Sequence, residues 1–174
     1  MNELLITTGC SGSLLAPAEP SRSLYKEVMT MKRDNQTPGK KAQYTAKWAR
    51  TMTKWLIAYS RRKGARWNLV EFGGKTGAEA RGIIDLIAVR KDHRQDVSGL
   101  KRGDLLDIVL IQTKGGSAAR PTEEDRVRLS MVAKYHRARA VVLAEWKRGK
   151  KLDLFKLEGT DWSSTAVPAA AIFG

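Results

Sequence analysis

The sequence predicts an α/β (α+β) domain with a central mixed β-sheet flanked by helices. Two observations lead to this prediction. Apolar runs of strand length recur along the chain, and two segments between them show helical periodicity, in the order helix, three strands, helix, two strands. The length of 174 residues suits one domain with a substantial core.

Composition divides the chain into three parts. Residues 1–40 contain small and turn-forming residues, five basic and four acidic side chains, and the break "RDNQTPGK". We therefore predict an N-terminal arm over residues 1–40, a core domain over 41–160 and a C-terminal tail over 161–174.

The first predicted helix covers residues 43–63. Its large apolar side chains recur at spacings of four, four, three and four, which places them on one face. This pattern favours packing against the sheet over stacking on nucleic-acid bases. The residues are Tyr44, Trp48, Met52, Trp55 and Tyr59.

The charge of this first helix is one-sided. Eight Lys or Arg residues and no acid occur between Lys41 and Arg66. A solvated helix normally mixes the two signs, so this distribution indicates contact with phosphates. The alternative is a basic helix that only keeps the protein in solution.

The remaining elements follow from turn signals and apolar runs. A Gly-Lys-Thr sequence after the first strand suggests a phosphate-binding loop, but Leu69 stands where that motif needs glycine, so we predict a hairpin turn. Pro121, Thr122 and three acids mark the start of the second helix. The predicted strands cover residues 66–72, 82–90, 107–116, 139–146 and 151–157.

Polar residues interrupt two otherwise apolar strands. If the second and third strands pair antiparallel around Ser98–Gly99, paired residue numbers sum to about 197, which places Asp85 opposite Gln112. Gln112 and Lys114 share a face because strand side chains alternate. An ion pair in the core would also explain these residues, although such pairs stabilise weakly.

This arrangement resembles the PD-(D/E)XK nuclease superfamily. Asp85 in "GIIDLIAV" and Gln112-x-Lys114 in "DIVLIQTK" are similar to its Asp on the second core strand and its acid-x-Lys pair on the third. The resemblance covers roughly residues 41–157. It implies a restriction-endonuclease-like αβββαβ core, as in Holliday-junction-resolvase-like enzymes.

The resemblance also implies roles for residues of this chain. Asp85 would be the principal metal ligand, Gln112 would offer a neutral oxygen where the family usually has Glu, and the Thr113 carbonyl would be a further ligand. Lys114 would orient the attacking water or stabilise the transition state. A further acid, in order of preference Glu79, Glu71 or Glu27, would complete the catalytic set.

The metal would be Mg²⁺ or Mn²⁺. Cys10, His93 and His136 are the whole inventory of Cys and His, too few for a Cys/His zinc site, so a metal must be held by oxygen. The single cysteine also excludes a disulfide within the chain, which suits the cytoplasm. No apolar stretch is long enough to span a membrane.

The net charge of +14 and pI near 10.2 indicate a polyanionic partner, and we expect DNA. The segment "GGSAARPT" before the second helix offers backbone N–H groups to a phosphate. The side chains predicted to bind nucleic acid are Lys54, Arg61, Arg62, Lys63, Lys75, Arg81, Arg120 and Arg126.

The favoured function is a metal-dependent endonuclease that hydrolyses DNA phosphodiester bonds, with selectivity for branched DNA or junctions. The alternative is a catalytically silent nucleic-acid-binding module on the same fold. An unrelated basic RNA-binding protein is a third hypothesis, weakened by the lack of a motif of that kind. By analogy with enzymes that cut both strands, we expect a homodimer.

Overall fold

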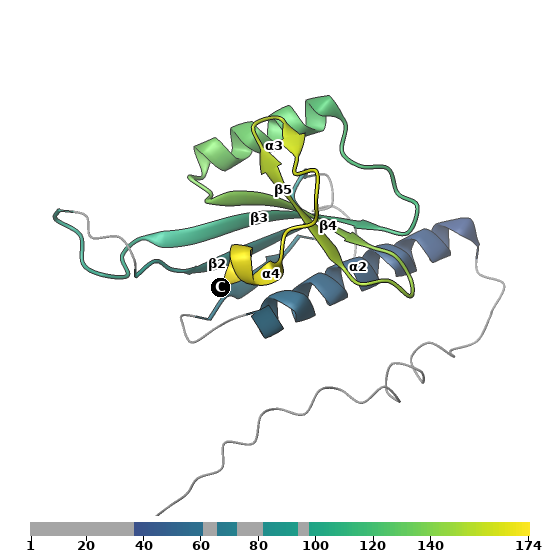
Figure 1. Ribbon diagram of the computed structural model, residues 1–174, viewed down its shortest axis with the longest axis horizontal. Coiled ribbons are helices and arrows are strands. Elements are labelled where there is room, and N and C mark those ends of the chain that lie inside the picture. The colour runs from purple at the N-terminus through teal and green to yellow at the C-terminus, as the bar shows by residue number, and fades with distance from the viewer. Residues whose placement is uncertain (1–36, 61–65, 73–81, 94–97) are drawn as a thin grey trace, which may run out of the picture. The chain divides into compact units, whose positions relative to one another are not determined.

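The computed structural model describes residues 37–60, 66–72, 82–93 and 98–174. The chain divides into two units, residues 1–36 and 37–174, and the described residues all belong to the second. Its elements are α2 (Pro38–Ser60), β1 (Asn68–Glu71), β2 (Leu86–Lys91), β3 (Leu106–Gly115), α3 (Glu123–Tyr135), β4 (Ala140–Trp146), β5 (Asp153–Glu158), β6 (Asp161–Trp162) and α4 (Ala169–Phe173) (Figure 1).

The strands form one mixed sheet in sequential order, β1 to β6. β3 and β4 are parallel, and every other neighbouring pair is antiparallel. The parallel pair is joined by a segment that contains α3, as a parallel connection requires a crossover. The predicted α/β class with a mixed sheet is confirmed.

The predicted register between β2 and β3 is also correct. Leu86 pairs with Ile111 and Arg90 with Asp107, so paired residue numbers sum to 197 along the whole ladder. Beyond this ladder the Asp85 N–H donates to the Ile111 carbonyl at 3.0 Å, so the register shifts there, and the Asp85 carboxylate accepts hydrogen bonds from Thr113. The polar residues of the two strands therefore meet at the end of β3.

Alternation along β3 divides the core between the two faces of the sheet. Val109 and Ile111 pack with Ile57 of α2, whereas Leu110 packs with Leu129 of α3. Figure 1 shows α3 on one side of the sheet and α2 with α4 on the other. Gln112 and Lys114 continue the row of Leu110 and thus belong to the face that α3 covers.

The aromatic face of the first helix is not the side that α2 buries most deeply, contrary to expectation, although Trp48 stacks on Trp146 of β4. The residues that α2 buries are Ala49, Thr53 and Ile57. The helix comes close to the end of β3, where a Cβ on Gly115 would lie 2.8 Å from the Thr45 carbonyl oxygen, so little room is left for a large side chain at that point. The aromatic side chains consequently lie on the flank or in solvent, with Tyr44, Trp55 and Tyr59 exposed.

Residues 161–174 are part of the core domain, and the expectation of a separate tail beyond residue 160 is wrong. Ile172 and Phe173 are buried with the side chains under α2. The Trp67 indole N–H donates to the Phe173 carbonyl at 2.8 Å, and the two rings meet edge to face. Burial of these side chains offsets the entropy of ordering the last helix, α4.

Candidate functional site

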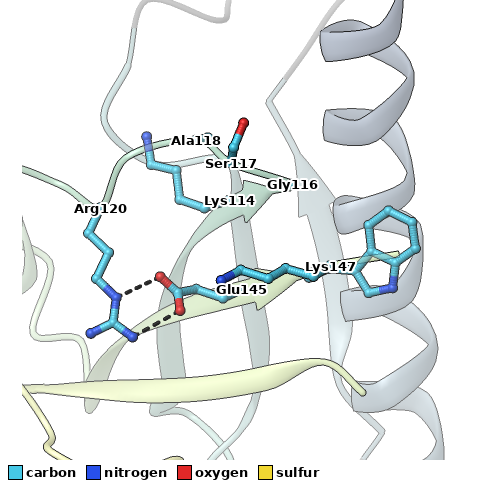
Figure 2. Close-up of a pocket in the computed structure, with 8 residues that line it drawn as sticks. Lys114, Gly116, Ser117, Ala118, Arg120, Glu145 and Lys147 are labelled. Atoms are coloured by element: carbon cyan, nitrogen blue, oxygen red, sulfur yellow. Dashed lines mark hydrogen bonds and ion pairs between the residues drawn. The ribbon is translucent and has the colours of Figure 1, made fainter. Parts of the chain in front are cut away.

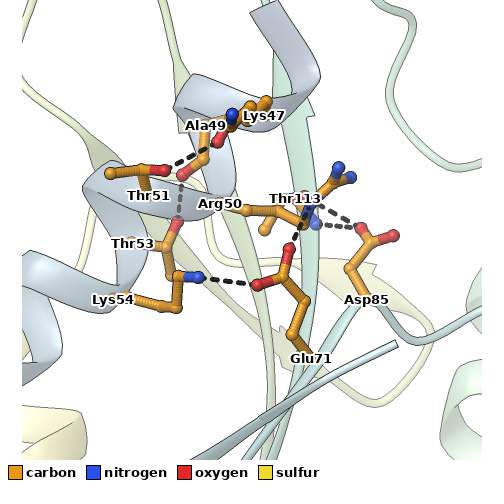
Figure 3. Close-up of polar contacts among 9 residues, drawn as sticks. All are labelled: Lys47, Ala49, Arg50, Thr51, Thr53, Lys54, Glu71, Asp85 and Thr113. Carbon is orange, nitrogen blue, oxygen red and sulfur yellow. Dashed lines mark hydrogen bonds and ion pairs between the residues drawn. The ribbon is translucent and has the colours of Figure 1, made fainter. Parts of the chain in front are cut away.

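Asp85 lies immediately before β2, and its backbone forms hydrogen bonds with segments on both sides of it, β3 and the residue after β1. Its N–H donates to the Ile111 carbonyl at 3.0 Å, and its carbonyl accepts from the Phe72 N–H at 2.9 Å. Its carboxylate Oδ2 accepts hydrogen bonds from the Thr113 N–H at 2.6 Å and the Thr113 hydroxyl at 3.0 Å. Figure 3 shows the other carboxylate oxygen turned away from Thr113, so it can meet a ligand.

Gln112 is buried in β3, one residue beyond the last β2–β3 pair, Leu86–Ile111, and it pairs with Leu143 of β4. Its carbonyl oxygen Oε1 has no hydrogen-bond partner among the residues that the structure describes. A buried acceptor left unpaired costs about 1–3 kcal/mol. This oxygen is therefore a candidate ligand atom.

Thr113 completes a set of oxygen donors. The N–H and C=O of one strand residue point to the same side, and the Thr113 N–H faces Asp85, so its carbonyl oxygen faces the same edge. Asp85 and the Thr113 carbonyl offer hard oxygen atoms of the kind that Mg²⁺ and Mn²⁺ prefer, and Gln112 offers another from the face that α3 covers, opposite to the Thr113 side chain that bonds Asp85. The set has a single negative charge, and the described ranges contain no group of three His, Cys, Asp or Glu side chains that could hold a metal.

Lys114 is partly buried and borders a cavity of about 250 Å³ (Figure 2). In the parallel ladder it pairs with Glu145 of β4, and Lys147 follows two residues later. The cavity thus gathers cationic side chains around one carboxylate at the end of β3. Its lining consists of Lys114, Gly116, Ser117, Ala118, Arg120, Glu145, Trp146 and Lys147.

Glu145 is a site residue that the sequence analysis missed. The Arg120 guanidinium donates two hydrogen bonds to its carboxylate, at 2.7 Å from Nε to Oε1 and 2.9 Å from Nη2 to Oε2. The hydrogen bond to Glu145 raises the pKa of Arg120 above its ordinary value. An acid in the apolar strand "AVVLAEW" gives the same signal that identified Asp85, and could have revealed it.

Glu71, one of the three acids considered as an extra metal ligand, lies on the side of the sheet that α2 covers. Lys54 Nζ lies 2.6 Å from its Oε2, and Arg50 Nε lies 2.9 Å from its Oε1 (Figure 3). The hydrogen bond from Lys54, followed by the charges of both cations, lowers the pKa of Glu71. Glu71 is therefore already neutralised by the helix. Glu79 and Glu27 fall outside the described residues.

Three of the cations predicted to bind nucleic acid also have partners within the fold. Lys54 pairs with Glu71 and Arg120 with Glu145, while Arg126 bonds the Thr160 carbonyl and lies 3.3 Å from Asp161. These contacts give each of them a structural role, and their binding to nucleic acid stays a prediction. Arg61, Arg62, Lys63, Lys75 and Arg81 lie outside the described residues.

The segment before α3 offers fewer free donors than expected. The Gly116 N–H donates to the Trp146 carbonyl at 2.9 Å, and the Ala118 N–H to the Gly115 carbonyl at 3.3 Å. The Thr122 side chain caps the helix, whose first turn contains Glu123, Glu124 and Asp125. Three acids there would repel a phosphate, so the cations of the cavity are the better anion ligands.

The chain matches no protein-family model and no curated protein. Within the described residues, no helix is long and apolar enough to cross a lipid bilayer. The site must therefore be interpreted from its own residues.

Proposed function

We propose that this protein is a metal-dependent endonuclease that hydrolyses phosphodiester bonds of DNA. The observation that supports this best is the unpartnered, buried Gln112 Oε1, which follows the last β2–β3 pair, Leu86–Ile111, and lies two residues before Lys114. A merely structural polar group in a core is normally satisfied by hydrogen bonds. A cation or a substrate would supply the missing partner.

The residues have separate tasks in this mechanism. Asp85, Gln112 and the Thr113 carbonyl would hold Mg²⁺ or Mn²⁺, and the two bonds from Thr113 keep the Asp85 carboxylate oriented. The ion, when bound, would promote ionisation of the attacking water and offset charge on the phosphate. Lys114 would place its ammonium group against a phosphate oxygen as negative charge develops there.

The cavity beside Lys114 supports an anionic substrate. Among the described residues that line it are the side chains of Lys114, Arg120 and Lys147 and one carboxylate, that of Glu145, so their formal charge is positive. Arg120 is held by Glu145, which leaves Lys114 and Lys147 as the cations best able to contact phosphate. A chain of this charge in the cytoplasm would meet nucleic acid as its most abundant polyanion.

The alternative is a nucleic-acid-binding module without catalysis. The ion pairs of Glu71 with Arg50 and Lys54 favour it, because they leave Asp85 as the one carboxylate of the donor set on the described residues. A divalent cation held by one carboxylate and two neutral oxygens would bind weakly.

The deciding experiment incubates the full chain with plasmid, branched and single-stranded DNA in Mg²⁺, Mn²⁺ or EDTA. We expect cleavage that requires the metal, and its loss in Asp85→Asn with DNA affinity nearly unchanged. Gln112→Glu adds a negative charge and should lower the Mg²⁺ concentration needed for half-maximal cleavage. Inactivity of the wild type and of Gln112→Glu under all these conditions, with DNA binding retained, would establish the silent module instead.

A further inference from the structure

The outer face of α2 presents aromatic side chains to solvent. Tyr44 is 48% exposed, Trp55 45% and Tyr59 68%. Tyr44 and Trp55 are about three helical turns apart and Tyr59 lies one turn further, so the three form a row about 22 Å long. Thr53, about two and a half turns from Tyr44, is fully buried on the opposite side of the helix. We call this row the aromatic ridge.

The charged side chains of α2 itself are all cations, and two of them, Arg50 and Lys54, pair with Glu71 of β1. Over Pro38–Ser60, α2 contains five cations and no acid, and Lys40, Lys41 and Lys47 are exposed. Exposed aromatic rings among cations suit single-stranded nucleic acid, because unpaired bases stack on the rings while the phosphates meet the charges. In a duplex, paired bases are stacked on one another and offer such a helix only their edges and phosphates.

A second helix, α3, shows that exposed apolar side chains alone do not indicate binding to nucleic acid. α3 also exposes an apolar row, with Val127 40%, Met131 65% and Tyr135 83% exposed. Its sequence, however, contains three acids and three bases, so it lacks the charge that would attract a polyanion. The two helices share the geometry and differ in charge, which makes α3 a built-in control.

The aromatic ridge begins beside the candidate site. The Tyr44 and Trp48 rings meet edge to face at 6.0 Å, and Trp48 stacks on Trp146 with centroids 6.5 Å apart. Trp146 lines the cavity that contains Lys114. Nucleic acid lying along the ridge would thus have one end near that cavity.

We infer that the aromatic ridge of α2 binds a single-stranded segment of nucleic acid, with bases stacked on Trp55 and Tyr59. This inference concerns binding and does not depend on the proposed cleavage. It is tested without metal, so that a failure of catalysis leaves its outcome unaffected.

The experiment measures affinity in EDTA for a fluorescent oligo(dT) strand and for a blunt duplex of the same length. Loss of one stacked base costs about 1–3 kcal/mol. Trp55→Ala and Tyr59→Ala should therefore each weaken single-strand binding about 5- to 150-fold, since 1.4 kcal/mol corresponds to tenfold, and change duplex binding less than twofold. Trp55→Phe keeps a ring and should retain most of the affinity, and Tyr135→Ala, the control on α3, should change neither.

Equal losses on the single strand and the duplex, or the same loss in Tyr135→Ala, would overturn the inference. So would unchanged single-strand affinity in both α2 variants. Two other occupants of the ridge are tested with a photo-crosslinking amino acid at position 55 in the full chain. Crosslinks to oligo(dT) are expected, whereas crosslinks to residues 1–36 or to a second copy that oligo(dT) does not displace would contradict the proposal.

Discussion

Strand β3 has polar clusters at both ends, and they differ in how completely their groups are paired. At its start, the buried Asp107 carboxylate lies 3.1 Å from Arg90 Nε and 2.8 Å from Arg139 Nε. Both guanidinium groups lie over the Trp67 ring, and both also bond carbonyl groups of the C-terminal residues, Gly174 and Ile172. Each of these three charged groups faces an opposite charge, and both cations also face a carbonyl.

At the other end of β3, the pairing is incomplete. Gln112 Oε1 is buried without a partner among the described residues, and one Asp85 oxygen takes both bonds from Thr113. Lys114 borders a cavity in place of a packed core. We call the end at Asp107 the closed end and the end at Gln112 and Lys114 the open end. The closed end resembles an ion cluster that stabilises the fold. The open end has hydrogen-bonding groups that are not used within the described residues, and binding and catalysis need such groups.

The first prediction concerns the removal of the Asp107 carboxylate at the closed end. Asp107→Ala leaves the largely buried guanidinium group of Arg90 and the more exposed one of Arg139 without their carboxylate, and removal of one partner from a buried ion pair costs about 3–5 kcal/mol. We expect urea denaturation to show a loss of this size in the free energy of unfolding. Asp85→Asn should cost less than about 1 kcal/mol, because its amide oxygen can still accept the Thr113 hydrogen bond. Similar losses in both variants would remove the distinction between the two ends.

The second prediction concerns function at the open end. If Lys114 stabilises charge in the transition state, Lys114→Ala should lower the rate of metal-dependent cleavage about 10²- to 10³-fold. The matched control is Lys147→Ala, which removes a cation from the same cavity but from outside the Gln112-x-Lys114 pair. Single-turnover rates check the result. A Lys114→Ala protein with the wild-type rate would leave the lysine a structural residue.

The strands and their register could be predicted from the sequence because they depend on local signals. Apolar runs bounded by turn residues placed β1 to β5, and the connection centred on Ser98–Gly99 fixed the sum of 197 that every β2–β3 pair obeys. That register brings Asp85 to the end of β3, where Gln112 and Thr113 lie. The hydrogen bonds from Thr113 to Asp85 could not be predicted, because they depend on where β2 departs from a regular ladder.

Features that depend on packing between distant segments could not be predicted. Periodicity identified the aromatic face of α2 but gave no indication that the helix approaches β3 too closely for large side chains, a limit set by Gly115 and Thr45. The burial of Phe173 depends on Trp67, more than 100 residues earlier. The alanine-rich sequence around it shows no pattern that would reveal this contact.

The third prediction tests the close approach that shapes the open end. A Cβ at Gly115 would meet the Thr45 carbonyl oxygen at 2.8 Å and its Cγ2 at 3.0 Å, so Gly115→Ala must push α2 away from β3. We expect a loss of about 1–3 kcal/mol in the free energy of unfolding, the usual range for overpacking. Gly39→Ala is the control, because a Cβ there meets nothing within 4 Å and the substitution should be neutral or slightly stabilising. Equal stability of the two variants would mean that the helix is not held where the structure places it.

The last prediction concerns Gln112, where the expected change in the free energy of unfolding is the smallest. Gln112→Met replaces the unpartnered amide with an apolar side chain of similar length. Removing a buried acceptor that has no partner should leave the free energy of unfolding unchanged or raise it by about 1 kcal/mol. Thr53→Val is the matched control: it removes a buried hydroxyl that does have a partner, the Ala49 carbonyl at 2.8 Å, and should cost about 1 kcal/mol.

If Gln112 is retained for ligand binding, Gln112→Met will lose metal-dependent cleavage while keeping its stability. If it is instead a structural residue, the variant will unfold at lower urea concentration than the wild type and keep its activity.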